Sequence, residues 1–388
     1  MFYYRYRPSG ELSLKELRYN EIYFSSATES NDPYDGKVFL SYKFDKEKWK
    51  RLFEMAWKRF YDSNTLLSLA DPLSIHLEKN YPTSFEEAIN YDYKSILLAI
   101  NDDLEPLKAH YLDQLIKQYI DTYRPGVVYT VSFSKTNSNT LMWSHYASKH
   151  KGFCLIFKPI DGFLYQDKEH RKDSVSRITP KGIAPSTGFG IPEGFLFEDI
   201  EYCSSIETID ASRFMPRYIF NKKIVNEEER IKFATENDRK CLEKHNCWCY
   251  EKESRLLLEK PIACFFGEHS DYSQEERIKH YQPTQLVGII LGALMDTKTK
   301  ERIREIISGL RERITRTTIN EFLFDFVLFE ASISDKHRDV NIVPKEIFVL
   351  SDVISKDDPQ FNSRLKEWED GWAWVYHEAG GSSKEQFP

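Results

Sequence analysis

Two glutamates near the middle of the chain are the acidic residues best placed for chemistry. Glu251 and Glu253 lie in the segment WCYEKESR, next to the aromatic residues Trp248 and Tyr250. Side chains two apart at the start of a strand share one face, so the two carboxylates are expected to point the same way. A carboxylate pair aimed into a cleft can bind a sugar diol, a cation or a metal ion. The alternative is an exposed strand start in which Glu253 simply pairs with Arg255.

An arginine near the N-terminus offers the complementary charge. Arg5 lies beside Tyr6 in the aromatic segment FYYRYR. A guanidinium held in an aromatic strand can present its fork of donors to a phosphate or a carboxylate. The alternative is a surface strand whose alternate side chains face water.

A third group of polar residues lies between these two. Ser132 and Ser134 alternate with an aromatic residue in the segment SFS, which places both hydroxyls on one face of a strand. Trp143, His145 and Tyr146 follow in LMWSHY, an unusual concentration of polar aromatics for one short helix. This group either lines a binding site or is a packing helix with His145 hydrogen-bonded inside.

Other motifs contribute less. Asn31 and Asp32 begin a strong turn signal, NDPYDG, and either line the same cleft or serve the turn conformation alone. The three cysteines at 241, 247 and 249 lack the paired spacing of a zinc site, and we expect no metal. The sequence contains no G-x-x-x-x-G-K-[ST] loop, G-x-G-x-x-G turn or G-x-S-x-G elbow, which argues against P-loop, Rossmann and α/β-hydrolase enzymes.

These residues must be positioned by a mixture of short strands and helices. Apolar spacings of three and four predict helices within residues 46–125, and β-branched or aromatic runs predict strands on either side. Ser84 and Glu87 form a capping-box pattern at the start of one helix. The expected strands are 2–7, 21–26, 127–133, 153–157, 254–258 and 286–291, and the expected helices outside the insertion are 12–18, 141–148, 206–238 and 303–314, with 160–200 irregular.

The composition is that of a folded protein and does not favour non-specific nucleic-acid binding. The 388 residues are 41% hydrophobic and 14% aromatic, and the formal net charge is −7. Non-specific nucleic-acid binding needs excess Lys and Arg, which this chain lacks overall. We expect no membrane span, because no run approaches the roughly 20 apolar residues required. With few cysteines and no signal-peptide pattern at the N-terminus, the expected location is the cytoplasm.

The expected fold is α+β, with a mixed, strongly curved sheet as its core. We expect residues 1–310 to form one domain in which residues 46–125 are a helical insertion. Residues 311–388 are expected to be a C-terminal extension that packs on the core, with a flexible tail after about residue 379.

Four segments together resemble a known family. They are YFSS…NDPYDG, SFSK…LMWSHYASKHKGFCLIF, WCYEKESRLL and LVGIILG, which occur in this order. The chain thereby resembles the bacterial domain of unknown function 2971 over about residues 1–300, with a helical insertion after NDPYDG. The family name implies no activity.

The three polar groups also resemble the motifs of toxin-type ADP-ribosyltransferases. Those enzymes carry an arginine on an aromatic first strand, a Ser-x-Ser strand and a Glu-x-Glu motif, in that order. Here Arg5, Ser132 with Ser134, and Glu251 with Glu253 stand at the matching positions. The chain departs from the pattern in having phenylalanine where threonine is usual between the serines, and more than a hundred residues between the last two motifs.

This second resemblance implies NAD as a substrate. Arg5 would bind the pyrophosphate or the adenylate ribose, and Ser132 would orient Glu253. Glu253 would bind the nicotinamide ribose and stabilise the oxocarbenium-like transition state, as glycosidase carboxylates do. Glu251 would position or deprotonate the acceptor. The residues expected to stack on nicotinamide are Tyr6, Phe24 and Tyr146.

Three functions therefore stand as hypotheses. The leading one is an NAD-consuming ADP-ribosyltransferase or NAD glycohydrolase with a protein or nucleic-acid acceptor, which the resemblance links to bacterial toxins and anti-phage effectors. The second is a Mg²⁺-dependent nuclease or phosphodiesterase that uses Asp32, Asp35 and the two glutamates. The third is a non-catalytic module that senses a nucleotide or binds a partner.

Overall fold

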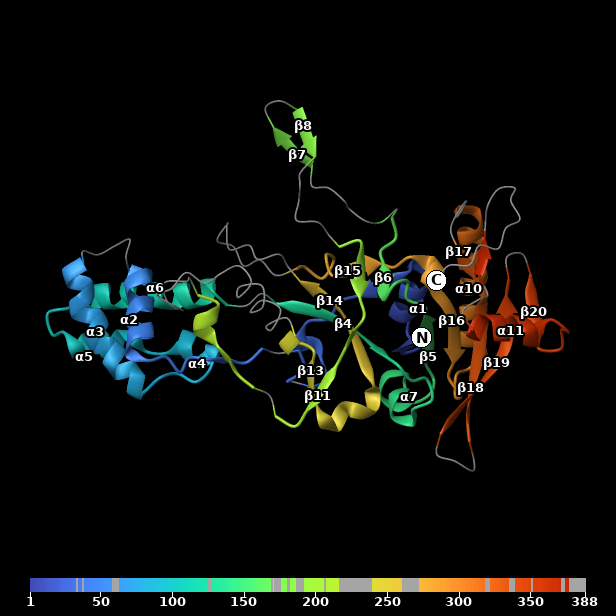
Figure 1. Cartoon of the computed structure of the whole chain (residues 1–388), viewed down its shortest axis with the longest axis horizontal. Helices are drawn as coiled ribbons and strands as arrows, with labels where there is room; N and C mark the ends of the chain where they lie inside the picture. Colours follow the sequence, from blue (N-terminus) through green and yellow to red (C-terminus); the bar gives the residue numbers. More distant parts are fainter. Residues whose placement is uncertain are drawn as a thin grey trace.

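The computed structural model combines a large β-sheet with a separate lobe of helices (Figure 1). The described residues are 1–32, 34–36, 38–57, 63–124, 127–168, 170, 176–179, 182–185, 192–205, 207–215, 239–259, 272–317, 322–334, 339–349, 352–370 and 374–376. None of the described helices is both long and apolar enough to cross a bilayer.

The core is an open, mixed sheet of nine strands, which confirms the α+β prediction. Its order is β10-β14-β4-β1-β5-β16-β18-β19-β20. Only the β16–β18 pair is parallel among the pairings of this sheet, and the other neighbours are antiparallel. In this order the strands span Glu198–Asp199, Glu253–Glu259, Val128–Ser134, Tyr3–Arg7, Phe153–Phe157, Leu286–Leu291, Phe326–Ile333, Val340–Phe348 and Val353–Ser355.

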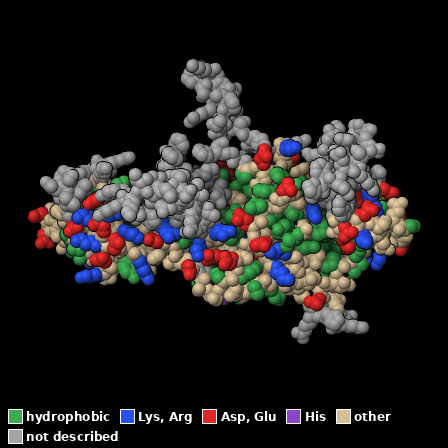
Figure 2. Space-filling model, viewed as in Figure 1, with side chains coloured by type: hydrophobic (Ala, Val, Ile, Leu, Met, Phe, Trp, Pro, Cys, Tyr) green, Lys and Arg blue, Asp and Glu red, His purple; other side chains and the backbone are tan. Residues whose placement is uncertain are grey.

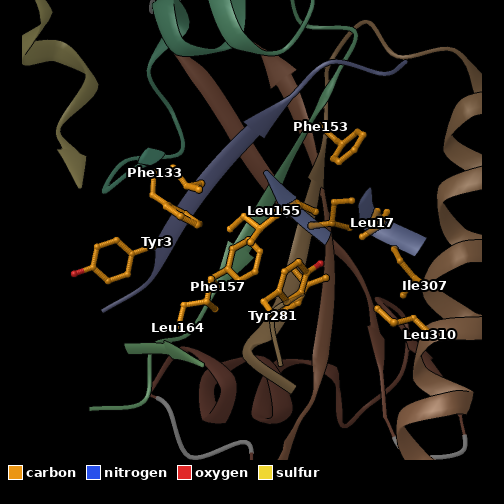
Figure 3. Packing of buried hydrophobic residues seen from close by; sticks show 14 of the residues in the cluster. Tyr3, Leu17, Phe133, Phe153, Leu155, Phe157, Leu164, Tyr281, Ile307 and Leu310 are labelled. Atoms are coloured by element: carbon orange, nitrogen blue, oxygen red, sulfur yellow. The ribbon is translucent and has the colours of Figure 1, made fainter. Parts of the chain in front are cut away.

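Helices cover both faces of this sheet. On one face α1 (Glu11–Tyr19) and α10 (Thr297–Thr317) complete a core in which Leu17, Ile307 and Leu310 approach aromatic residues of the strands (Figure 3). On the other face α7 (Thr140–Tyr146) and α11 (Phe361–Glu369) complete a second core. Every residue of β5 and β16 is buried, because these central strands are apolar on both sides.

The sheet divides between β1 and β4. These two strands pair at only one position, Tyr4 with Ser134. Further along β4, Thr130 instead forms a bridge with Ser25, in the segment that follows β2 (Glu21–Tyr23). In contrast, β4 and β14 pair along seven consecutive positions. The departure of β1 from β4 leaves room for side chains from both strands to border a cavity.

Five helices between residues 46 and 122 form a lobe at the end of the molecule opposite α11, and residues 40–44 and 209–215 contribute to its core (Figure 1). Trp49, Phe53 and Trp57 stack in sequence along one helix of this core. The capping box predicted at Ser84 is confirmed. The helices are α2 Lys46–Trp57, α3 Ser63–Lys79, α4 Phe85–Asn90, α5 Tyr93–Ile100 and α6 Pro106–Thr122. On the face in Figure 2, basic and acidic side chains are interspersed over this lobe.

Short paired strands complete the described fold. Residues 160–200, expected to be irregular, contain four of them beyond the sheet strand β10. Of the helix expected at 206–238, the described part holds instead a strand and a 3-10 turn, and 216–238 lies outside the described residues. The segment after residue 311 supplies β18–β20 of the main sheet, and the expected tail lies outside the described residues.

These remaining elements are as follows. The paired strands are β2 with β15 (Ile278–His280), β3 (Leu40–Ser41) with β12 (Ile209–Asp210), β6 (Phe163–Tyr165) with β9 (Gly194–Leu196), β7 (Ser176–Thr179) with β8 (Gly182–Pro185), β11 (Glu201–Cys203) with β13 (Glu243–His245), and β17 (Phe322–Phe324) with β21 (Trp374–Tyr376). The 3-10 helices are η1 Ala27–Glu29, η2 Ala211–Arg213, η3 Asn246–Glu251 and η4 Pro283–Gln285.

Candidate functional site

A cavity of about 330 Å³ lies where β1 separates from β4. This volume is at the lower end of the range for small-molecule sites in proteins. It is bordered by β1, the segment after β2, β4, α7 and the turn that leads into β14. Ten of the fourteen predicted site residues line it: Arg5, Tyr6, Asn31, Asp32, Ser132, Ser134, Tyr146, Trp248, Glu251 and Glu253.

The two glutamates face a common partner because of the backbone between them. Glu251 ends the 3-10 helix η3, and Glu253 begins β14. Lys252 between them is left-handed, with φ 45° and ψ 51°, which turns the chain sharply. As a result both carboxylates reach the ammonium of Lys244, at 2.6 Å from Glu251 Oε2 and 2.9 Å from Glu253 Oε2.

Glu253 is fully enclosed and held by charged donors. Arg255 Nε donates to its Oε1 at 2.6 Å and Arg255 Nη2 donates to its Oε2 at 3.1 Å. Burial alone would raise the pKa of Glu253, but the charges of Arg255 and Lys244, together with hydrogen bonds from Arg255 and Ser132, lower it. Glu253 is therefore an ionised carboxylate near neutral pH.

Glu251 has the opposite tendency. Tyr146 Oη donates to its Oε1 at 2.6 Å, and Lys244 donates to its other oxygen. Burial raises the pKa of Glu251 despite these donors, and the neighbouring Glu253 charge adds to the rise. The pair is thus split into one carboxylate that stays charged and one that takes up a proton more readily. Such a split is the arrangement that acid–base catalysis requires.

Two cations in the site were not among the predicted site residues. Lys244 lies on β13, and nothing in its charged sequence surroundings distinguishes it from a surface lysine. Arg255 was expected only as a pairing partner of Glu253, and that contact is present. Arg255 also donates to Asp35 and, through Nη1, to the Cys241 carbonyl at 2.8 Å. Lys244 and Arg255 therefore join three of the carboxylates that line the cavity, those of Asp35, Glu251 and Glu253.

The two serines of β4 lie on the same face of the strand but differ in exposure and in contacts. Ser132 is exposed, lines the cavity and helps to lower the pKa of Glu253. Ser134 is buried, and its Oγ donates to the Glu251 carbonyl at 2.6 Å and accepts from the Thr136 N–H at 3.1 Å. Ser134 therefore fixes the backbone of the glutamate turn, whereas Ser132 faces the cavity that Glu253 also lines.

Arg5 borders the cavity from the other face of the sheet. Its guanidinium carbon lies 5.9 Å from the centre of the Phe133 ring, on the side opposite Ser132 and Ser134. Only 8% of Arg5 is exposed, and its Nη1 has no hydrogen-bond partner. Burial, with a smaller effect of Arg7, lowers the pKa of Arg5 to about 10, so it remains a cation at neutral pH. Such a buried, unpaired N–H group can donate a hydrogen bond to an anionic ligand.

Four predicted site residues do not line the cavity. Phe24 is fully buried in the core, 4.7 Å from the Phe195 ring, and cannot stack on a ligand there. Trp143 is also fully buried, and its Nε1 donates to the Asn137 carbonyl at 2.8 Å.

The other two lie on α7 and in η3. His145 is exposed on α7 rather than enclosed by a packing helix. Tyr250 is partly buried against the second core, and its carbonyl accepts from Asn139 Nδ2 at 3.1 Å. The bond to Tyr250 thus links the start of α7 to the glutamate turn, whereas Trp143 binds the loop before α7.

The acidic residues of the turn after β2 do not form a metal centre with the glutamates. Asp32 Oδ1 accepts from the Tyr34 N–H at 2.9 Å, which serves the turn itself. Asp35 pairs with Arg255 and lies 3.5 Å from Lys244 Nζ. Within the described part of the chain, no three His, Cys, Asp or Glu side chains are placed to share a metal ion.

Comparison with known proteins gives one match. No curated protein and no solved structure matches the chain. A family model matches less than a third of the chain, a shorter stretch than the resemblance over residues 1–300 predicted. The matched stretch contains both glutamates but neither Arg5 nor Ser132. From α7 through the glutamate turn into β14, residues 142–256 match the family described as protein of unknown function (DUF2971).

Proposed function

We propose that the cavity between β1 and β4 binds NAD and cleaves the bond between nicotinamide and ribose. The observation that carries the proposal is that Glu253, which stays ionised, borders the same cavity as Ser132 and Arg5. These three residues come from three neighbouring strands of the sheet, although they are far apart in the sequence.

The chemistry follows from the charges of these groups. When the C1′–N bond breaks, its electron pair leaves with nicotinamide, and the ribose becomes an oxocarbenium-like cation. An ionised carboxylate held in place beside the ribose stabilises that cation, and Glu253 is the carboxylate whose charge is secured. Water or an acceptor group then adds to C1′ and loses a proton. Glu251, whose pKa is raised, takes that proton when it is ionised.

Arg5 is suited to the anionic part of the same molecule. The pyrophosphate of NAD carries two negative charges, and the unpaired Nη1 of Arg5 offers a donor for one of its oxygens. Trp248 and Tyr146, which line the cavity, offer aromatic surface for the nicotinamide ring. The adjoining cavity of about 360 Å³, which shares Trp248 and Lys244 with the first, gives room for the rest of a dinucleotide or for an acceptor.

The test is the release of nicotinamide from NAD by the purified chain, followed by chromatography. Glu253→Gln keeps the shape of the side chain and removes its charge, and should lower the rate by about 100-fold, the loss typical of removing one transition-state stabilising group. Lys252→Met, which changes an exposed lysine in the same turn, should leave the rate unchanged. EDTA should have no effect, in contrast to the Mg²⁺-dependent nuclease hypothesis. Thermal stabilisation by NAD without nicotinamide release would instead support a nucleotide-binding module.

A further inference from the structure

Lys244 occupies the centre of the acidic side of the cavity. Its Nζ lies 2.6 Å from Glu251 Oε2, 2.9 Å from Glu253 Oε2 and 3.5 Å from Asp35 Oδ2. Its side chain is only 6% exposed. One ammonium group therefore satisfies three carboxylates at once, inside a cavity that also reaches solvent-facing residues such as Ser132.

An aromatic ring completes this environment. Lys244 Nζ lies 5.2 Å from the centre of the Trp248 ring. Carboxylates together with the face of an indole ring are the surroundings in which proteins bind organic cations. The geometry thus describes a cation-binding subsite whose present occupant belongs to the protein itself.

Arg5, the cation on the other side of the cavity, is not paired in this way. Arg5 Nη1 has no hydrogen-bond partner, although only 8% of Arg5 is exposed. The anion-binding side of the cavity therefore has a donor to spare, while the carboxylates of the cation-binding side are already paired. This asymmetry is what a ligand with one anionic and one cationic part would encounter.

NAD is such a ligand, because it joins an anionic pyrophosphate to a cationic pyridinium. A second positive charge cannot approach Glu253 favourably while Lys244 lies 2.9 Å from its Oε2. We propose that Lys244 is an internal blocking group, which fills the position of the cationic nicotinamide end of NAD and must withdraw before that end binds. This inference rests on the proposed function of the cavity and adds a control of access to it.

The strand that carries Lys244 is short. β13 has three residues, and among the described strands it pairs only with the three-residue β11. Apart from this pairing, the contact described for the Lys244 carbonyl is with the Cys203 thiol, whose Sγ lies 3.7 Å away. A rotation of the Lys244 side chain removes its ammonium from the two glutamates, while β14 keeps its pairing with β4 over seven positions.

The experiment compares Lys244→Met with the matched control Lys252→Met. Methionine keeps most of the volume of the lysine stem and removes its charge. The probes are 1-methylnicotinamide, which carries the pyridinium charge, and nicotinamide, which does not, with binding measured by calorimetry. Lys244→Met should bind 1-methylnicotinamide at least about tenfold more tightly than the wild type or Lys252→Met, since it uncovers two or more carboxylates. Nicotinamide binding should not gain, and adding Glu253→Gln should remove the gain.

Equal affinity of Lys244→Met and the wild type for 1-methylnicotinamide would overturn the inference, and so would an equal gain for both probes. Because this readout needs no turnover, it separates the two proposals. A gain in binding without nicotinamide release from NAD would refute the catalytic function and leave the cation subsite. Nicotinamide release without a gain in 1-methylnicotinamide binding would support the catalytic function and refute the cation subsite.

A second measurement uses the wild-type chain, in case the methionine variant does not fold. Labelling with an amine-reactive reagent, read by mass spectrometry, should show Lys244 protected in the free protein and Lys252 reactive. Saturating NAD should raise the labelling of Lys244 several-fold relative to Lys252. Unchanged protection of Lys244 with NAD bound would overturn the inference.

Discussion

The buried pair of Arg255 and Glu253 gives the sharpest prediction about the stability of the site. Both side chains are 1% exposed, and they are joined by contacts of 2.6 and 3.1 Å. Arg255→Met leaves a buried carboxylate that Lys244 alone must neutralise. Breaking a buried ion pair from one side costs about 3–5 kcal/mol, and we expect the free energy of unfolding to fall by that amount. Glu253→Gln in the same chain should recover about 2–3 kcal/mol of the loss, as a double-mutant coupling.

The assay is urea unfolding of the wild type, the two single variants and the double variant. The control is the same cycle at Arg302 and Glu11, whose side chains are 41% and 77% exposed. The coupling at this exposed pair should be much smaller, because water and salt screen it. A coupling at Arg255 and Glu253 no larger than at the exposed pair would refute the description of the site as a dry charge network.

Further predictions concern the frame around the site, and urea unfolding tests each of them. Gly292→Ala should destabilise by about 3 kcal/mol, since its Cβ would lie 2.3 Å from a backbone carbonyl oxygen, whereas Gly309→Ala, in open space on α10, should stabilise by about 1 kcal/mol. Trp368→Ala should cost about 3–5 kcal/mol, because the ring is buried against the sheet and its Nε1 donates to a β16 carbonyl. Burial opposes ionisation of Glu29, but hydrogen bonds from Arg277, a backbone N–H and a tyrosine lower its pKa to about 2. Its contribution is therefore present above pH 4.5 and lost as pH falls towards about 2, and Glu29→Gln should flatten that loss. The Glu29 contacts would be contradicted if Glu29→Gln left the loss of stability at low pH unchanged. The Trp368 contact would be contradicted if Trp368→Ala left the free energy of unfolding unchanged. The close approach at Gly292 would be contradicted if the two glycine substitutions had equal effects.

The sequence predicted the elements whose residues leave little choice. The runs 153–157 and 286–291 are apolar throughout, so central strands with these bounds were expected and are present. Ser84 and Glu87 marked a helix start because the capping box is a local interaction. The strands after residue 311 were missed, since their place in the sheet depends on pairing with distant β16.

The site was predictable in its members more than in its geometry. Ser132 and Glu253 could be brought together by motif, but Lys244 could not, because its role arises from a three-residue strand that pairs with distant β11. Trp143 was chosen for its polar aromatic character, whereas the fold uses its Nε1 to bind a loop carbonyl. Arg5 borders the expected cavity, but strand alternation places it on the other face, which the motif itself does not reveal.

The most direct test of the account is a structure of the Glu253→Gln variant with NAD bound. The account predicts NAD in the cavity between β1 and β4, with the nicotinamide ribose within hydrogen-bond distance of residue 253 and the pyrophosphate beside Arg5. It also predicts that the Lys244 ammonium has moved away from the two glutamate positions. NAD bound elsewhere on the chain, or absent at saturating concentration, would contradict the central claim.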